Sequence, residues 1–230
     1  MNSLKSILHL HAKDWFYWLL APWVMIVLPS FTVNMIISLF ARTDTGIYTG
    51  GLAGIFIYML IVGIILVSRT FPFVLGFGRR RVDYFVGTAL VAFAVCLIEA
   101  LVVLLLSVIE YYLTNGWFLR LHFFHLPFLN DGSLLAQGWI YFISMVFLFF
   151  LGFTIACLYQ RTGRNGMLIG GGLALLLGTI GSYICTYYGL WFNVFTWMVD
   201  QKAVGLASWL LLPVALCLPA SYLLLRKATI

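Results

Sequence analysis

Charge is scarce in this sequence, and the scarcity excludes an ordinary soluble domain. Asp, Glu, Lys and Arg together make up 9% of the 230 residues, whereas soluble domains carry about 25%. Hydrophobic residues make up 63%, which is more apolar surface than one core of this size can hide. The net charge of +6 comes from basic residues between apolar stretches. No basic groove interleaved with aromatics is present, so nucleic acid is not an expected partner.

The sequence also lacks the motifs of common enzyme and ATPase classes. It has no G-x-x-x-x-G-K-[ST] phosphate loop, because arginines follow Gly76 and Gly78 where that motif needs lysine and serine or threonine. It has no H-E-x-x-H and no G-x-S-x-G motif. We therefore expect no catalytic residue on this chain, and expect any ATP hydrolysis that it uses to reside in a partner subunit.

Clusters of metal-ligating residues are lacking as well. The four cysteines lie far apart in apolar stretches and form no C-x-x-C pair, so we expect them to pack as small buried hydrophobes. His122 and His125 have a spacing that can bind a metal if the segment is helical, and Asp131 is nearby in the sequence, but the pattern does not establish a third ligand. We expect these histidines to pack at the membrane interface, and expect no metal or other cofactor on this chain.

Long, continuous apolar stretches are what the sequence has in abundance. A bilayer-spanning helix needs roughly 20 apolar residues, and a β-barrel would instead show short alternating segments. Six stretches qualify, at residues 15–40, 50–68, 84–113, 139–159, 167–190 and 203–225. Pro22 and Pro29 predict a kink in the first. The fold class is therefore an all-α integral membrane protein, with residues 1–230 forming a single transmembrane domain of six helices.

The lysines and arginines orient these spans. Basic residues are enriched in cytoplasmic loops. With the N-terminus inside, the inner side holds ten of the 13 basic residues: Lys5, Lys13, Arg69, Arg79, Arg80, Arg81, Arg161, Arg164, Arg226 and Lys227. The outer side holds the other three: Arg42, Arg120 and Lys202. This bias predicts that both termini are cytoplasmic, which agrees with an even number of spans.

Three segments have the composition of interfacial structure. Residues 1–14 mix charged and apolar side chains ahead of the first span, which predicts an amphipathic helix on the inner leaflet. Residues 114–136 and 190–203 are rich in aromatics on the outer side, and aromatic side chains favour the headgroup level. Whether either outer segment re-enters the membrane is left open by the sequence.

The inner loop of residues 69–83 combines consecutive arginines with aromatic residues. The arginines alone are explained by a positive-inside anchor. Three aromatics in the loop, with Tyr84 directly after it, are more than a polar turn needs, which favours a docking loop for a cytoplasmic partner. The candidate docking residues are Phe71, Phe73, Gly76, Phe77, Arg79, Arg80, Arg81, Asp83 and Tyr84.

The run FPFVLGFGRRRVDYFVGT, residues 71–88, resembles the first inner loop of permease subunits of ABC-2-type transporters. In several bacterial members a short apolar stretch leads to an arginine-rich turn, and D-Y-F-x-G-T then opens the third span. The overall layout is also similar to that family, whose arrangement is that of a type V exporter: an amphipathic inner helix, six spans and a membrane-dipping segment before the last span.

The resemblance implies a function and a set of partners. Such a permease pairs with a second copy or a homologue in the bacterial plasma membrane, and two separate ATPase subunits bind ATP and Mg beneath it. The inner loop then acts as a coupling helix on the ATPase. The expected function is export of a hydrophobic or amphipathic cargo, such as a drug, a lipid or an antimicrobial peptide.

Glu99 and Glu110 are the two acidic residues within a predicted span. They are eleven residues apart and so lie on nearly the same helical face. A carboxylate in the membrane costs several kcal/mol unless it faces protein or water. One interpretation is a cargo or proton path lined by this face, and the other is a polar tie between helices. A proton site would suit the alternative function, an ATP-independent proton-coupled carrier; a structural membrane subunit is the other alternative.

Glycines with small-x-x-x-small spacing predict close helix packing. They open the second span at Gly46, Gly50 and Gly54, and the fifth span at Gly166 and Gly170.

Overall fold

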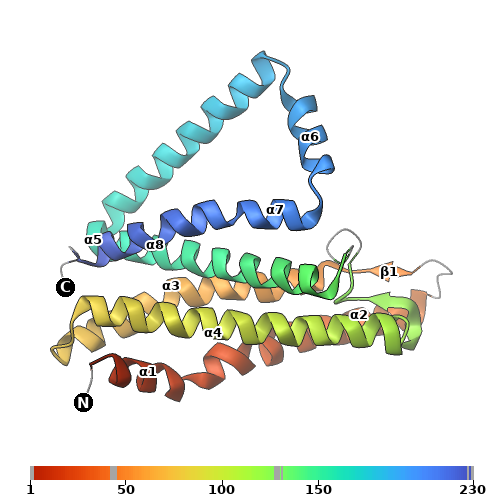
Figure 1. Ribbon diagram of the computed structural model, residues 1–230, viewed down its shortest axis with the longest axis horizontal. Helices are drawn as coiled ribbons and strands as arrows, with labels where there is room; N and C mark the ends of the chain where they lie inside the picture. The colour runs from red at the N-terminus through yellow and green to blue at the C-terminus, as the bar shows by residue number, and fades with distance from the viewer. Residues whose placement is uncertain (1–2, 42–45, 127–129, 131, 227, 229–230) are drawn as a thin grey trace.

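The computed structural model describes residues 3–41, 46–126, 130, 132–226 and 228 (Figure 1). Helices make up nearly all of this part of the chain. In order, the elements are α1 (Ser3–Lys13), η1 (Phe16–Leu20), η2 (Trp23–Val27), α2 (Leu28–Ala41), β1 (Ile47–Tyr48), η3 (Gly50–Leu52), α3 (Ala53–Gly76), α4 (Arg81–Val108), η4 (Ile109–Leu113), η5 (Gly116–Arg120), β2 (Leu121–His122), α5 (Leu134–Tyr187), α6 (Trp191–Asp200), α7 (Ala203–Trp209) and α8 (Leu211–Arg226).

Within the described residues, five helical stretches are long and apolar enough to cross a membrane: Phe16–Ala41, Gly50–Gly76, Arg81–Leu113, Leu134–Tyr187 and Ala203–Arg226. Helices satisfy their own backbone hydrogen bonds, as a lipid environment requires. The expectation of an all-α, multi-pass membrane protein is confirmed at this level.

The fourth stretch, α5, is 54 residues long, so a straight helix would measure about 80 Å, far more than a bilayer is thick. The helix is broken at Gly163, whose φ of 65° and ψ of −162° are not helical. Figure 1 shows the chain reversing at this point, where the ribbon passes from green to cyan. The span predicted at residues 139–159 falls within this one broken helix, and so does the span predicted at residues 167–190 except for its last three residues.

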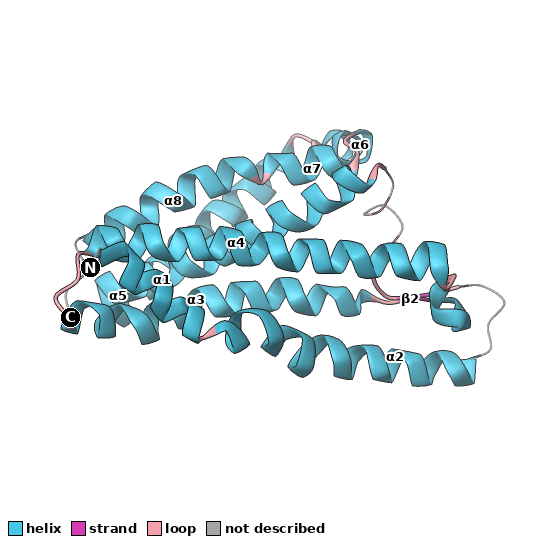
Figure 2. Ribbon diagram, turned by 60° about the horizontal axis from the view of Figure 1, so that its bottom comes forward, coloured by secondary structure: helices cyan, strands magenta, loops and turns pink. Residues whose placement is uncertain are grey.

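The core of the bundle lies where α3, α4, α8 and the first part of α5 pack together (Figure 2). The closest approach is between α3 and α5. A Cβ atom on Gly63 would collide with the carbonyl oxygen of Phe149, and one on Gly152 would collide with the carbonyl oxygen of Leu60. Because these glycines have no side chain, the backbones of the two helices can approach each other closely, as small residues allow in membrane helix pairs.

The predicted glycine ladders are not where the backbones meet most closely. Gly54 does allow the first two spans to pack closely, because a Cβ atom there would collide with the side chain of Ile26. A Cβ atom on Gly50 would meet nothing within 4 Å, and one on Gly166 would meet only Thr162 of its own helix. After Gly163 the second arm of α5 leans away from the bundle (Figure 1), and nearly all of its side chains are exposed.

The N-terminal helix is confirmed as α1. It packs against α4 through Ile7 and His11, both almost fully buried. The predicted disturbance at the prolines of the first span takes the form of two π-helical turns, η1 and η2, on either side of Pro22. Pro29 lies within α2.

The inner connection is shorter than the predicted loop of residues 69–83. The α3 helix continues through Pro72 to Gly76, and α4 begins at Arg81. Only residues 77–80 are non-helical. The prediction of a loop was wrong for the rest of this segment, because Ser68 and Arg69 extend the helix past its apolar stretch.

The two segments predicted to lie on the outer side differ in structure. Within residues 114–136, β2 pairs in parallel with β1, and the next two residues, Phe123 and Phe124, are buried among the helices. Residues 127–129 and 131 lie outside the described part. In the segment 190–203, α6 has 10 residues and no buried side chain. A helix of that length spans about 15 Å and is too short to cross a bilayer.

Candidate functional site

The turn between α3 and α4, named the inner turn after its predicted side of the membrane, is built by a glycine in a left-handed conformation. Gly78 has a φ of 67°, which glycine adopts at little cost. Its N–H donates to the carbonyl oxygen of Leu75 at 2.8 Å, and the N–H of Arg79 donates to that of Val74 at 3.3 Å. These two bonds form a Schellman motif, which satisfies the last carbonyls of α3. The tight turn places the arginines directly at the start of α4.

Two of the predicted docking residues are buried beneath the turn. Phe71 and Tyr84 are fully buried, with ring centroids 5.4 Å apart. The Tyr84 hydroxyl also shares a hydrogen bond of 2.8 Å with the hydroxyl of Thr70. These residues fasten the end of α3 to the start of α4, so a partner protein cannot reach them in this conformation.

Two other aromatics are accessible at the tip. Phe73 is 52% exposed and Phe77 is 68% exposed. Their rings form an edge-to-face pair with centroids 4.7 Å apart. Gly76 and Arg80 are exposed beside them. The accessible part of the predicted docking loop is therefore an apolar pair flanked by a cation.

Arg81 has a different surrounding from Arg80. Its Nη1 donates to the main-chain carbonyl oxygens of Arg226 at 2.7 Å and Leu225 at 3.4 Å. A guanidinium at this position satisfies the free carbonyls at the end of α8. Asp83 lies in the first turn of α4, where an acidic side chain stabilises the helix dipole.

Glu99 lies in the middle of α4 and is 1% exposed. The indole Nε1 of Trp23, in η2, donates to its Oε2 at 2.7 Å. Its other oxygen, Oε1, is buried and has no hydrogen-bond partner among the described residues. The hydrogen bond between Trp23 and Glu99 thus connects the first span to α4, and Oε1 of Glu99 takes no part in it. A role for Glu99 in a cargo path stays a prediction.

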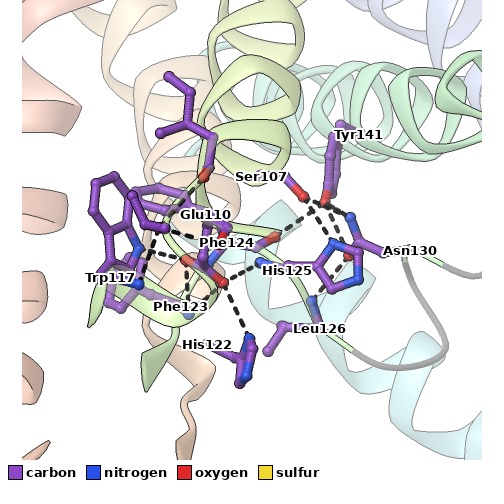
Figure 3. A network of polar contacts seen from close by, with 12 residues as sticks. Ser107, Glu110, Trp117, His122, Phe123, Phe124, His125, Leu126, Asn130 and Tyr141 are labelled. Carbon is purple, nitrogen blue, oxygen red and sulfur yellow. Dashed lines mark hydrogen bonds and ion pairs between the residues drawn. The ribbon is translucent and has the colours of Figure 1, made fainter. Parts of the chain in front are cut away.

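Glu110 lies in η4, which continues α4 beyond Val108, and is fully buried (Figure 3). Its carboxylate accepts hydrogen bonds from the indole of Trp117 at 2.7 Å and from the main-chain N–H groups of Phe123, Phe124 and His125 at 2.9–3.1 Å. Charge-assisted bonds of this kind are stronger than neutral ones. Glu110 therefore binds the outer loop as a main-chain clamp, and its predicted place in a cargo path is untested.

The clamp holds a turn with an unusual backbone. Asn115, Trp117 and Arg120 have positive φ angles of 48°, 55° and 56°. Each such residue costs on the order of 1 kcal/mol and persists only where its surroundings enforce it. The hydrogen bonds to Glu110 supply that enforcement, because they hold both sides of the turn.

A second polar cluster lies beside the clamp. The side-chain amide of Asn130 donates to the hydroxyls of Ser107 at 2.8 Å and Tyr141 at 2.9 Å, and to Oε1 of Gln137 at 3.1 Å. His125 stacks on Tyr111 with ring centroids 4.3 Å apart. A cavity of about 260 Å³ opens next to this cluster. A role for Asn130, Gln137 and Tyr141 was not predicted, because uncharged polar residues in an aromatic segment carry no motif.

No group of three or more His, Cys, Asp or Glu residues is arranged to hold a metal ion in the described part of the chain. His122 instead lies 3.8 Å from the Glu110 carboxylate and stacks on Tyr48.

No protein-family model matches the chain, and no curated protein and no solved structure matches it. The residues and their geometry are therefore what supports a function.

Proposed function

We propose that this chain is the membrane-spanning permease subunit of an ATP-binding-cassette exporter of the ABC-2 type. It moves a hydrophobic or amphipathic cargo outward through the bacterial plasma membrane. ATP is bound and hydrolysed by separate cytoplasmic subunits, and a second permease copy or homologue completes the transporter.

The inner turn carries this proposal. The accessible pair Phe73 and Phe77 stands at a sharp turn beside Arg80. Exposed aromatics next to arginine are typical of protein interfaces, where these residue types supply most of the binding energy. The turn itself is rigid, because Phe71 and Tyr84 fasten it from below. A rigid, apolar tip suits the transmission of force from an ATPase to two helices at once.

The layout supports the same proposal. Breaking α5 at Gly163 gives two arms, and counting each arm as a span gives six spans in place of five. The N- and C-termini lie at one end of the bundle in Figures 1 and 2, together with the inner turn. In the proposed topology, with six spans and both termini cytoplasmic, this turn is accessible to an ATPase.

Co-purification tests the proposal. The full chain is tagged, extracted from its native membranes in mild detergent, and analysed for proteins that come with it. We expect a nucleotide-binding subunit in roughly equal amount. Replacing both Phe73 and Phe77 with alanine should reduce its recovery by about tenfold or more, since central aromatic contacts are each worth a few kcal/mol.

Tyr112 supplies the matched control, because it is an equally exposed aromatic in η4, beyond the opposite end of α4. Tyr112→Ala should leave recovery of the ATPase unchanged. If the wild-type chain purifies alone, or if Tyr112→Ala and the double variant lose the ATPase equally, the proposed docking site is wrong.

Glu99 favours a second candidate, an ATP-independent proton-coupled carrier. A fully buried carboxyl group with one oxygen unpartnered among the described residues is a position where a proton can be taken up and released. In proteoliposomes of the full chain alone, a panel of amphipathic dyes should then drive proton uptake, read with a pH-sensitive dye. Glu99→Gln keeps an oxygen for the Trp23 bond and removes the titratable group, so it should abolish uptake. Uptake that survives this variant rules the carrier out.

A further inference from the structure

A groove of about 250 Å³ lies between the start of the first span and α3. One wall comes from Asp14, Tyr17 and Trp18, and the other from one face of α3. At its side the Tyr58 hydroxyl donates to the main-chain carbonyl oxygen of Tyr17 at 2.7 Å, which fixes the two walls to each other. The groove is thus part of the fold, and not a gap between independent segments.

The length of the groove matches the hydrocarbon thickness of one leaflet. Its α3 residues lie on a single helical face that runs from Tyr58 to Arg69. Eleven residues of helix measure about 16 Å, and half of a hydrocarbon core measures about 15 Å. Along this face the lining is aliphatic, with Ile61 and Ile65 partly exposed. An acyl chain lying against α3 would therefore be covered over its depth in the leaflet.

Two opposite charges also line the groove. Asp14 directly precedes the first span, and Arg69 lies near the end of α3 on the side of the termini. Neither side chain forms an ion pair or a hydrogen bond with any residue that the structure describes. Their positions in the chain put both charges toward the headgroup level of that leaflet. The polar headgroup of a phospholipid whose acyl chain lies in the groove would be at the same level.

We propose that this groove binds one phospholipid of the inner leaflet, with an acyl chain along α3, its phosphate at Arg69 and a primary ammonium headgroup at Asp14. Phosphatidylethanolamine has this pair of charges. Phosphatidylglycerol offers a phosphate but no cation for Asp14, and choline carries a cation that cannot donate a hydrogen bond. The site is therefore selective for an aminophospholipid. This inference does not depend on an ATPase partner.

The test uses the full chain in nanodiscs that contain phosphatidylethanolamine and phosphatidylglycerol in equal amounts. The protein is released into detergent, washed, and its retained lipids are identified by native mass spectrometry. We expect one retained phospholipid, with phosphatidylethanolamine favoured by about tenfold, as one charge-assisted contact provides.

The variants separate the parts of the site. Arg69→Gln should lower retention of both lipids about tenfold, and Asp14→Asn should abolish the preference but keep a bound phospholipid. Ile61→Trp, at a partly exposed position, should fill the groove and lower retention of both lipids without touching either charge. Arg161→Gln changes an exposed inner arginine outside the groove and should change nothing.

Retention in the supplied ratio by the wild-type chain would overturn the proposal, because it would indicate annular lipid without a site. Equal retention by the wild-type chain, Arg69→Gln and Ile61→Trp would overturn it as well.

Discussion

Arg81 and Arg226 connect the inner turn to the last helix. The guanidinium of Arg81, at the first position of α4, donates to the main-chain carbonyl oxygen of Arg226 at 2.7 Å. The three consecutive arginines are therefore not equivalent. Arg80 is exposed beside the accessible aromatics, whereas Arg81 is used within the fold. Movement of the turn would reach α8 through this contact.

Arg81→Gln should loosen the end of α8. The substitution removes a charged donor from two terminal carbonyls, which at a partly exposed position costs about 1 kcal/mol. Hydrogen exchange of a peptide covering residues 217–226 should accelerate about fivefold, as that energy implies. Arg80→Gln is the matched control and should leave this peptide unchanged. Equal protection in both variants would show that the Arg81 contact does not hold α8.

Glu110→Gln should release the outer loop. The side-chain amide nitrogen of glutamine cannot accept a hydrogen bond. In the place of Oε2 it leaves the donors of Trp117 and Phe124 without an acceptor, and in the place of Oε1 it leaves the N–H of His125 without one. Such a change costs about 3 kcal/mol. A cysteine introduced at Phe123, fully buried in the wild-type fold, should become accessible to a thiol reagent in this variant.

Glu99→Gln is the control for this experiment, because Glu99 lies eleven residues away and binds Trp23 instead. It should leave the cysteine at position 123 protected. Protection that persists in Glu110→Gln would mean that the loop is held by packing alone.

Gly152→Ala should destabilise the helix bundle. Its new methyl group would collide with the carbonyl oxygen of Leu60, and rigid backbone cannot move aside as a side chain can. Overpacking of this kind costs about 1–3 kcal/mol. The thermal midpoint of the full chain in detergent should fall by several degrees. Gly171→Ala, where a Cβ atom meets nothing within 4 Å, should leave the midpoint unchanged, and equal midpoints for both variants would contradict the close contact.

His11 should make the docking of α1 sensitive to acid. Burial lowers the pKa of its imidazole from 6.5 to about 4, and the nearby Asp14 carboxylate opposes only part of that shift. His11 contacts Thr88 of α4 at 3.1 Å and the ring of Trp18. Because the docked state binds the proton less well, docking is fully stable above pH 6.5 and loses stability as the pH falls toward 4. The full loss is about 3 kcal/mol.

The mobility of a spin label on a cysteine at the exposed position of His9, in a chain without the native cysteines, should therefore increase between pH 6.5 and pH 4. His11→Phe keeps an aromatic ring and cannot titrate, so its label should not respond. A response that persists in His11→Phe would assign the acid effect to another group.

The spans were predictable from the sequence because lipid demands long apolar helices, and that demand leaves a strong compositional pattern. The inner turn was partly predictable. Gly78 and the arginines mark its position, but aromatic residues occur both among the side chains buried beneath the turn and among those that remain accessible. Phe71 is buried and Phe77 is exposed. Tertiary packing determines this difference, and the residue type does not reveal it.

The polar contacts of the glutamates were not predictable. Trp23 and Glu99 are 76 residues apart, and nothing in the sequence pairs them. Glu110 is bound mainly by main-chain N–H groups, which every residue except proline carries. The glycine spacing predicted only part of the close packing, at Gly54. A small-x-x-x-small pattern marks a face that allows close approach, whereas Gly63 and Gly152 contact backbone because the fold brings α3 and α5 together there.

Site-specific photo-crosslinking from Phe77 tests whether the inner turn contacts a nucleotide-binding subunit. A photoreactive phenylalanine analogue replaces Phe77 in the full chain, and a second variant carries it at Tyr112 as the outer control. Both are irradiated in native membranes. We predict a crosslink from position 77, and not from position 112, to a nucleotide-binding protein. Crosslinks from position 77 to lipid alone would contradict it.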